Sequence, residues 1–240
     1  MHKAIMPALA VAVTLTCTEG CGPTKVTTVT SPAAKAHQVQ TVIVLPFMRL
    51  ATPQVLDSRA PDFSVPRGVK RSDIEIAIPP ASAEAAGRET TTVPPFAPEK
   101  VTDLVYRKLQ GRKGLRVLPA SEAIHAMKTQ KSGDAEVTEQ DAKDMAMKAG
   151  ADGALIGRVL IYRERDGSRW GADPAVVGFE VKLVGADGQT LWTGNYYEKQ
   201  RPLIEDFVGF WQHGFGFVTA EKLAEYGAKR LACEFPYGTK

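Results

Sequence analysis

The chain has 240 residues, and its 30 lysines and arginines nearly balance its 27 aspartates and glutamates, giving a formal net charge of +3 at pH 7. Nucleic-acid binding, which usually needs a concentrated basic stripe, is therefore not expected. The three cysteines include no CxxC pair, which excludes a disulfide framework and a metal or redox motif of that kind. The length suits one ordinary domain with a tail.

The N-terminus is typical of an export signal that ends at a cysteine. A short basic start precedes an apolar run over residues 4–15, which is too short to cross a bilayer as a helix. Bacterial lipoproteins are cleaved just before a cysteine that carries a lipid such as palmitate, and Cys21 is favoured here over Cys17. Neither Thr18 nor Gly22 is the aspartate that holds enterobacterial lipoproteins in the inner membrane, so the expected destination is the outer membrane, facing the periplasm. A cleaved secretory peptide without lipid is the alternative.

Composition divides the chain into three parts. Residues 1–20 form the expected signal peptide, and residues 21–40, rich in Thr, Ala, Pro and Ser, are interpreted as a lipid-anchored flexible tether. Residues 41–240 are expected to form a single α/β domain. Seven of the sixteen prolines lie in residues 48–96. Because proline lacks the N–H group that a sheet ladder needs, this stretch is interpreted as a surface insertion, with at most one edge strand at residues 74–78.

The first half of the expected domain alternates strands and helices. A continuous apolar run at residues 41–47, interrupted by a proline, indicates a buried strand. Pro98 is well placed in the first turn of a helix whose apolar residues recur every three and four positions. Glycines end that helix, and a short strand at 115–118 and a helix near 121–130 follow.

The second half predicts one more helix, a meander and a closing helix. Thr138 and Asp141 form a capping pattern that opens a helix ending at Gly150. Three strands separated by Asp-Gly turns follow, and strands joined by short turns must be antiparallel. These strands cover residues 154–162, 177–183 and 191–197, and the last helix covers residues 219–235. The fold class is therefore α/β, an α+β sandwich with a mixed sheet of about five strands, a C-terminal antiparallel meander and flanking helices.

One segment carries a family resemblance. Residues 151–157, ADGALIG, run into a hairpin with the GQTLW segment at 188–192. With the proline-ended first strand, this pattern resembles the periplasmic α/β domain of curli-secretion lipoproteins and of the lipoprotein activators of penicillin-binding proteins. It also resembles the N-terminal domain of the TolB translocation protein. The likeness covers about residues 41–235 and implies an accessory protein of the cell envelope.

The residues of this motif are expected to have structural roles rather than functional ones. Gly150 and Gly153 permit turn conformations, Asp152 can accept hydrogen bonds from nearby backbone amides, and Gly157 allows close approach. Pore formation, which some of the resembling proteins perform, is not expected, because the chain lacks paired alternating strands of about ten residues beyond those its own sheet needs.

Catalytic motifs are absent from the sequence. Of the four histidines, His2 and His37 lie in the expected signal and tether, and His125 and His213 stand apart from other ligands. No HExxH, GxSxG or GxxxxGK[ST] pattern occurs. We therefore expect no enzyme activity, no cofactor and no metal. An unrecognised hydrolase is the alternative, since any two carboxylates can meet in a fold.

Aromatic residues are concentrated in residues 205–217, where three glycines interrupt them. Two interpretations are open: the rings cover the end of the core, or they form an exposed patch that binds another envelope protein, as large aromatic side chains often do. A second candidate lies in the turn that follows the first meander strand. The candidate partner-binding residues are Phe207, Phe210, Trp211, Phe215, Phe217, Trp170 and Arg169.

Together these features predict an outer-membrane lipoprotein that reaches the membrane through an N-terminal lipid and binds an envelope protein. Its expected work is cell-envelope assembly or the regulation of a peptidoglycan synthase. A structural subunit of a secretion or envelope complex is the second interpretation. The sequence leaves the oligomeric state and the identity of the partner open.

Overall fold

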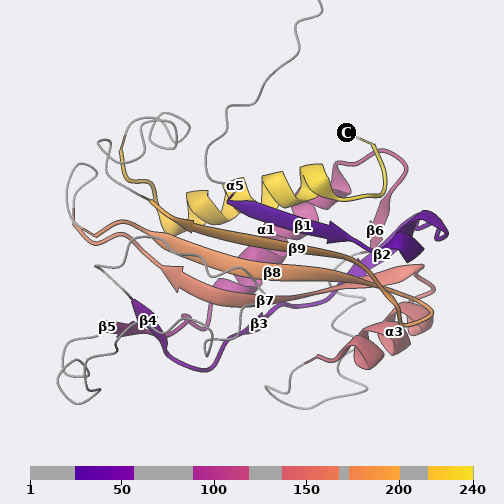
Figure 1. Ribbon diagram of the computed structural model, residues 1–240, viewed down its shortest axis with the longest axis horizontal. Helices are drawn as coiled ribbons and strands as arrows, with labels where there is room; N and C mark the ends of the chain where they lie inside the picture. Colours follow the sequence, from indigo (N-terminus) through magenta and orange to yellow (C-terminus); the bar gives the residue numbers. More distant parts are fainter. Residues whose placement is uncertain (1–24, 57–88, 119–136, 168–172, 201–215, 240) are drawn as a thin grey trace, which may run out of the picture.

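The computed structural model describes residues 25–56, 89–118, 137–167, 173–200 and 216–239. Seven of the described strands form one mixed sheet, and helices lie on both of its faces (Figure 1). The strands of this sheet are β1 (Val26–Thr30), β2 (Thr41–Val44), β3 (Met48–Arg49), β6 (Arg116–Leu118), β7 (Gly153–Arg163), β8 (Val176–Gly185) and β9 (Thr190–Lys199). The described helices are the 3₁₀ helix η1 (Pro32–Lys35), α1 (Ala97–Gln110), α3 (Glu139–Lys148) and α5 (Ala220–Glu234).

The strand order is β1-β9-β8-β7-β2-β6, and β3 pairs with β7 beyond the end of β2. β7, β8 and β9 form the predicted antiparallel meander, and β2 runs parallel to both β7 and β6. The α/β class, the mixed sheet and the flanking helices are confirmed. The sheet has seven strands rather than about five, because β1, within the expected tether, pairs with β9, and β3, within the expected insertion, pairs with β7.

The two faces of the sheet are covered unequally. α1 and α5 lie on one face, and α3 lies on the other (Figure 1). The larger core cluster joins α1 and α5 to the sheet through the predicted apolar stripe of α1, which consists of Val101, Leu104, Val105 and Leu109. Each fully buried side chain of this kind contributes about 1.5–3 kcal/mol. A smaller cluster under α3 contains Ala142, Met145 and Ala146.

The predicted capping box at the start of α3 is confirmed. The Asp141 amide donates to Thr138 Oγ1 at 3.2 Å, and the Thr138 amide donates to Asp141 Oδ2 at 2.9 Å. The two reciprocal bonds satisfy backbone donors that the first turn of a helix otherwise leaves unpaired.

The segment expected to be a tether is folded from Lys25 onward. Val26–Thr30 pairs antiparallel with β9, and Ala34 in η1 is buried. The sequence of β1, VTTVT, consists entirely of β-branched residues, which favour strands. Threonine-rich composition suggested a linker, whereas the pairing partner lies about 165 residues further along the chain, so local composition could not reveal it.

The proline-rich stretch also contains regular structure at its ends. Besides β3, it holds β4 (Gln54–Leu56) and β5 (Glu89–Thr91), which form a separate antiparallel pair. The predicted edge strand at 74–78 and the predicted helix near 121–130 lie outside the described residues. Within the described part of the chain, no helix is both long and apolar enough to cross a bilayer.

Candidate functional site

The face of the sheet opposite α1 and α5 is the candidate functional site. Phe179, Val181 and Leu183 of β8 belong to the larger core, so Glu180 and Lys182, which alternate with them, project from the opposite face. The same alternation applies to β9, where Trp192 and Tyr196 point into the core. We call the outward side chains of β7, β8, β9 and β1 the open face: Arg158, Glu180, Lys182, Thr193, Asn195, Tyr197, Thr27 and Val29.

The register of the strands orders these side chains into rows across the sheet. One row consists of Arg158, Glu180, Asn195 and Thr27, and the next consists of Ile156, Lys182, Thr193 and Val29. Each row therefore begins at α3 with charged or bulky groups and ends on β1 with small β-branched ones.

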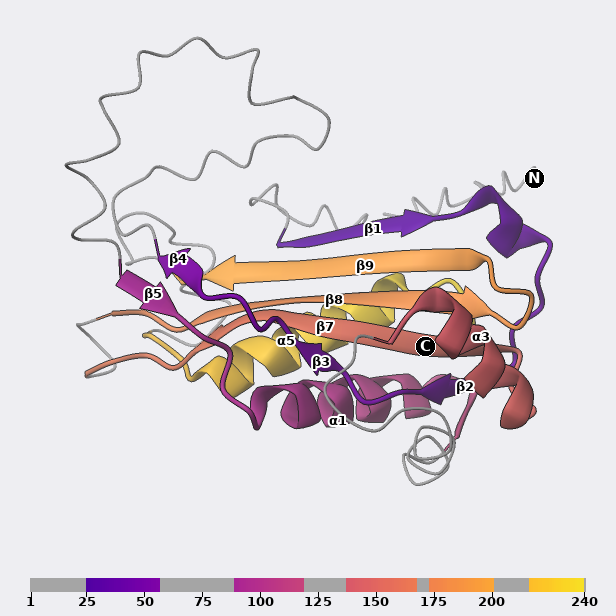
Figure 2. The same cartoon turned by 90° about the horizontal axis from the view of Figure 1, so that it is seen from below.

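α3 covers only one end of this face. Figure 2 shows α3 in front of β7 and β8, whereas no described helix lies in front of β9 or β1. The exposed fractions agree, since Val29 is 62% exposed and Tyr197 is 51% exposed. Val29 and Tyr197 lie four positions apart in the strand register, with the polar side chains of Asn195 and Thr27 between them.

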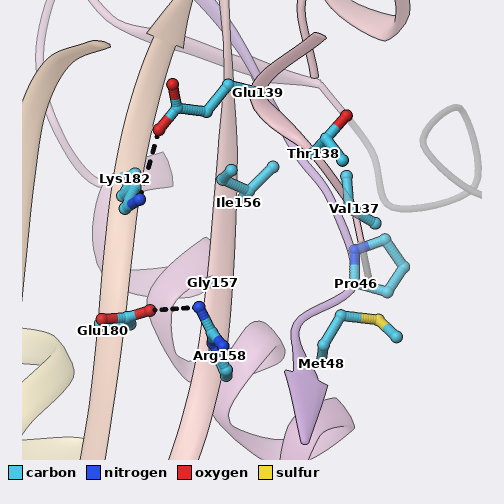
Figure 3. Close-up of a pocket in the computed structure, with 10 residues that line it drawn as sticks. All are labelled: Pro46, Met48, Val137, Thr138, Glu139, Ile156, Gly157, Arg158, Glu180 and Lys182. Atoms are coloured by element: carbon cyan, nitrogen blue, oxygen red, sulfur yellow. Dashed lines mark hydrogen bonds and ion pairs between the residues drawn. The ribbon is translucent and has the colours of Figure 1, made fainter. Parts of the chain in front are cut away.

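A hollow of about 200 Å³ lies where the open face meets α3 (Figure 3). Arg158 Nη2 lies 3.1 Å from Glu180 Oε1, and Lys182 Nζ lies 3.3 Å from Glu139 Oε1. The remaining wall is apolar and consists of Pro46, Met48, Val137 and Ile156, with Thr138 and the backbone of Gly157.

The chemistry of the hollow favours recognition over reaction. Both carboxylates are paired with a cation, so neither is poised as an isolated acid or base. Pockets for small-molecule ligands usually measure about 300–1,000 Å³, so this one fits a side chain more readily than a metabolite. Within the described residues, no group of three or more His, Cys, Asp or Glu side chains could hold a metal ion.

The most deeply buried polar cluster is structural. Tyr196 Oη donates to Glu198 Oε2 at 2.6 Å, and Lys25 Nζ lies 2.7 Å from Glu198 Oε1. Burial, with the nearby Glu198 carboxylate, raises the pKa of Tyr196 far above its ordinary range. Burial likewise raises the pKa of Tyr162 to about 12, and the charges of Glu164 and Glu221 add to the shift. Both phenols therefore stay protonated.

The scaffold interpretation of the ADGALIG motif is confirmed. Asp152 Oδ2 accepts the backbone amides of Gln40 and Thr41 at 2.9 and 2.8 Å, which fixes the start of β2 against the turn before β7. Gly150 has φ 62°, a conformation that favours glycine. A Cβ atom on Gly153 would lie 2.8 Å from the carbonyl oxygen of Val184.

The residues predicted to bind a partner or a lipid lie mostly outside the described residues. These are Cys17, Cys21, Arg169, Trp170, Phe207, Phe210, Trp211 and Phe215. Phe217 is described and only 7% exposed, so it is not an exposed contact, which favours the core alternative for this ring. Cys233 is a free, half-buried thiol in α5.

Sequence analysis did not identify the open face. The available signal was the alternation in VVGFEVKLVG, which places Glu180 and Lys182 on the side opposite the apolar residues. That pattern marks a polar face, but it cannot show whether a helix elsewhere in the chain covers it.

The described residues thus form an α/β sandwich in which α1 and α5 cover one face of the sheet and α3 covers one end of the other (Figure 1, Figure 2). No family model and no curated protein matches the sequence. The chain is distantly similar to the PelC dodecamer from Paraburkholderia phytofirmans, with 14% identity over 86% of this chain and 92% of that chain and a TM-score of 0.42. It is also similar to the LpoB C-terminal domain from Salmonella enterica (10% identity, 67% of this chain, 83% of that chain, TM-score 0.35). A third similar structure is lipoprotein GNA1162 from Neisseria meningitidis (12% identity, 72% of this chain, 94% of that chain, TM-score 0.34).

At these identities and TM-scores, the matches assign the chain to no family.

Proposed function

We propose that this protein is a lipoprotein of the outer membrane, anchored at Cys21 and facing the periplasm, that binds an envelope protein through the open face and catalyses no reaction. Its work is cell-envelope assembly or the regulation of a peptidoglycan synthase. The observation that carries the proposal is the half of this sheet face that no described helix covers (Figure 2), where Val29 and Tyr197 are more than half exposed.

The open face has the composition of a protein-binding surface. It combines exposed apolar groups with polar side chains whose charges are matched, and such surfaces exclude water in the centre while hydrogen bonds form at the rim. The adjoining hollow can accept one side chain of the partner between Met48 and Ile156. Paired ions at its wall, Arg158 with Glu180 and Lys182 with Glu139, select against a partner that brings an unmatched charge.

Site-specific photo-crosslinking in living cells tests the binding surface. A crosslinking amino acid replaces Val29, which is 62% exposed on the open face, or, as the control, Asp103 on the outer face of α1, whose side chain is 55% exposed. We expect one discrete adduct with another envelope protein from position 29 and none from position 103. Equal adducts from both positions, or none from either, would contradict the proposal. Adducts between two copies of the chain would favour the structural-subunit interpretation instead.

Mass spectrometry of the same protein extracted from membranes tests the anchor. The expected mature chain starts at Cys21 with a diacylglyceryl group. An unmodified N-terminus would remove the lipid from the proposal, whatever the crosslinks show.

A further inference from the structure

We propose that one end of the domain, rather than either face, lies against the bilayer. This anchor end is the row of paired residues Tyr162, Val177, Glu198 and Lys25, where β7 and β9 end and β8 and β1 begin. The inference rests on the lipid anchor of the proposed function. It adds the surface that meets the membrane.

The chain enters the sheet at a fixed point. Lys25 Nζ lies 2.7 Å from Glu198 Oε1, and the Lys25 carbonyl accepts the amide of Tyr197 at 3.0 Å. The side chains of Lys25 and Glu198 are 18% and 2% exposed. Separating such a pair is unfavourable, because it leaves a buried charge without its partner. Lys25 is therefore held in place on the sheet, and the connection to the lipid-bearing cysteine consists only of the residues before it.

The connection between lipid and sheet is short. Four residues from Cys21 to Lys25 span at most about 14 Å when fully extended, and eight residues from Cys17 span about 29 Å. β9 alone, with ten residues, is about 34 Å long. A lipid at Cys21 therefore holds the anchor end closer to the bilayer than the opposite end of the sheet, where β9 begins.

Exposed aromatic rings gather at the same end. Phe96, 52% exposed, stands edge-on against Tyr162 at 5.8 Å between centroids, and Lys100 Nζ lies 5.9 Å from the Phe96 ring. Tyr197, also about half exposed, lies next to Glu198 in β9. Aromatic rings with a polar end and lysines with a long stem suit the boundary between lipid headgroups and acyl chains.

The sides of the molecule offer less to a membrane. On the outer surface of α1 and α5, the charged pair of Lys108 with Glu225 faces water. Acids and bases are balanced near the anchor end, where Arg163 pairs with Asp173. The proposed orientation of the domain at the bilayer therefore needs no anionic lipid. In this orientation the open face remains accessible to a protein beside the membrane.

Fluorescence quenching from the membrane tests this orientation. The acylated full-length protein, with its lipid confirmed by mass spectrometry, is reconstituted into phosphatidylcholine vesicles that contain headgroup-labelled quencher lipid. In a Cys233→Ser background, a fluorophore is placed at Asp166→Cys, just beyond β7 at the anchor end, or at Glu234→Cys, at the far end of α5. Both positions are exposed acidic residues, so the two variants are matched.

We expect at least threefold stronger quenching at position 166 than at position 234. Equal quenching with the acyl group present would overturn the orientation and leave the lipid anchor intact, whereas a missing acyl group would remove the anchor itself. A variant with about 20 Gly/Ser residues inserted after Thr24 leaves the sheet unchanged but adds an average reach of about 25 Å. The ratio of quenching at position 166 to quenching at position 234 should then fall toward one. An unchanged ratio would show that the short connection does not set the orientation.

Discussion

At the scale of single residues, Gly157 is a place where one methyl group would disturb the packing between β7 and the segment after β2. A Cβ atom there would lie 2.7 Å from the ring of Phe47, which is 3% exposed. We expect Gly157→Ala to lower the free energy of unfolding by about 1–3 kcal/mol in denaturant titrations. Gly111→Ala is the control, since its nearest neighbour would be the Lys108 carbonyl at 3.9 Å. Equal stability of both variants would show that the Phe47 ring can move aside.

Arg112 joins the end of α1 to the C-terminal segment. Its guanidinium donates to the carbonyl oxygens of Ala232 at 2.5 Å, Gly238 at 2.7 Å, Tyr237 at 2.8 Å and Phe235 at 3.0 Å. Two of these carbonyls belong to the last turn of α5 and the residue after it, where the helix has no further amides to satisfy them.

Arg112→Ala should therefore lower the free energy of unfolding by about 2–3 kcal/mol, because charge-assisted hydrogen bonds to several carbonyls are lost together. The matched control is Arg107→Ala, whose exposed pair with Asp103 should contribute less than about 1 kcal/mol. Thermal or chemical unfolding of both variants measures the difference. A loss for Arg112→Ala no larger than the control's would contradict this account of the C-terminal segment.

His37 makes stability depend weakly on pH. One ring nitrogen lies 2.8 Å from the Ala33 carbonyl, and the other lies 3.0 Å from Asp187 Oδ2. The Ala33 carbonyl first, and then the Asp187 carboxylate, raise the pKa of His37 above its ordinary value of 6.5. The amide of Gln189 first, with His37 adding to the shift, lowers the pKa of Asp187 below 3.8.

Folding thus favours the protonated imidazole and the ionised carboxylate. The stability due to His37 is fully present below pH 6.5 and is lost as the pH rises through the higher folded-state pKa. The part due to Asp187 is present above pH 3.8 and is lost as the pH falls through its lowered pKa. NMR titration should give a His37 pKa above 6.5, and Asp187→Asn should return it only part of the way, because the Ala33 carbonyl remains. A His37 pKa of 6.5 or less in the intact protein would contradict the contact.

At the scale of elements, β1 is the segment whose removal tests the fold most directly. A chain that begins at Lys25 keeps the strand and its ion pair, whereas one that begins at Pro32 leaves Glu198, which is 3% exposed, without Lys25. We expect the second chain to be at least about 3 kcal/mol less stable in denaturant unfolding, since a buried charge loses its partner and β9 becomes an edge. A flexible tether at residues 22–40 would instead make the two chains equally stable.

At the scale of the whole molecule, the two faces of the sheet divide the work. α1 and α5 close one face and supply most of the core, so that face determines stability. Of the described helices, α3 covers one end of the other face and none lies in front of β9 or β1, the strands to which the proposed partner would bind (Figure 2). If the proposed lipid is attached at Cys21, the short connection before Lys25 ties the orientation of the open face at the membrane to the fold itself.

Local patterns in the sequence determined the elements. The stripe of α1, the Thr138 capping box, the Asp-Gly turns and the alternation in β8 each depend on neighbours within a few residues, and they were predictable for that reason. Asp152 is an exception, because its backbone-bonding role follows from the residue type, but the amides that it accepts, those of Gln40 and Thr41, lie 112 and 111 residues earlier in the chain.

Contacts between distant parts of the chain were decided by the tertiary structure alone. β1 pairs with β9, Lys25 with Glu198, and Arg112 with the carbonyls after α5, each across more than 100 residues. The open face also belongs here, because whether a polar strand face stays uncovered depends on where a remote helix packs. Sequence patterns report which side of an element is polar, whereas long-range packing decides what that side meets.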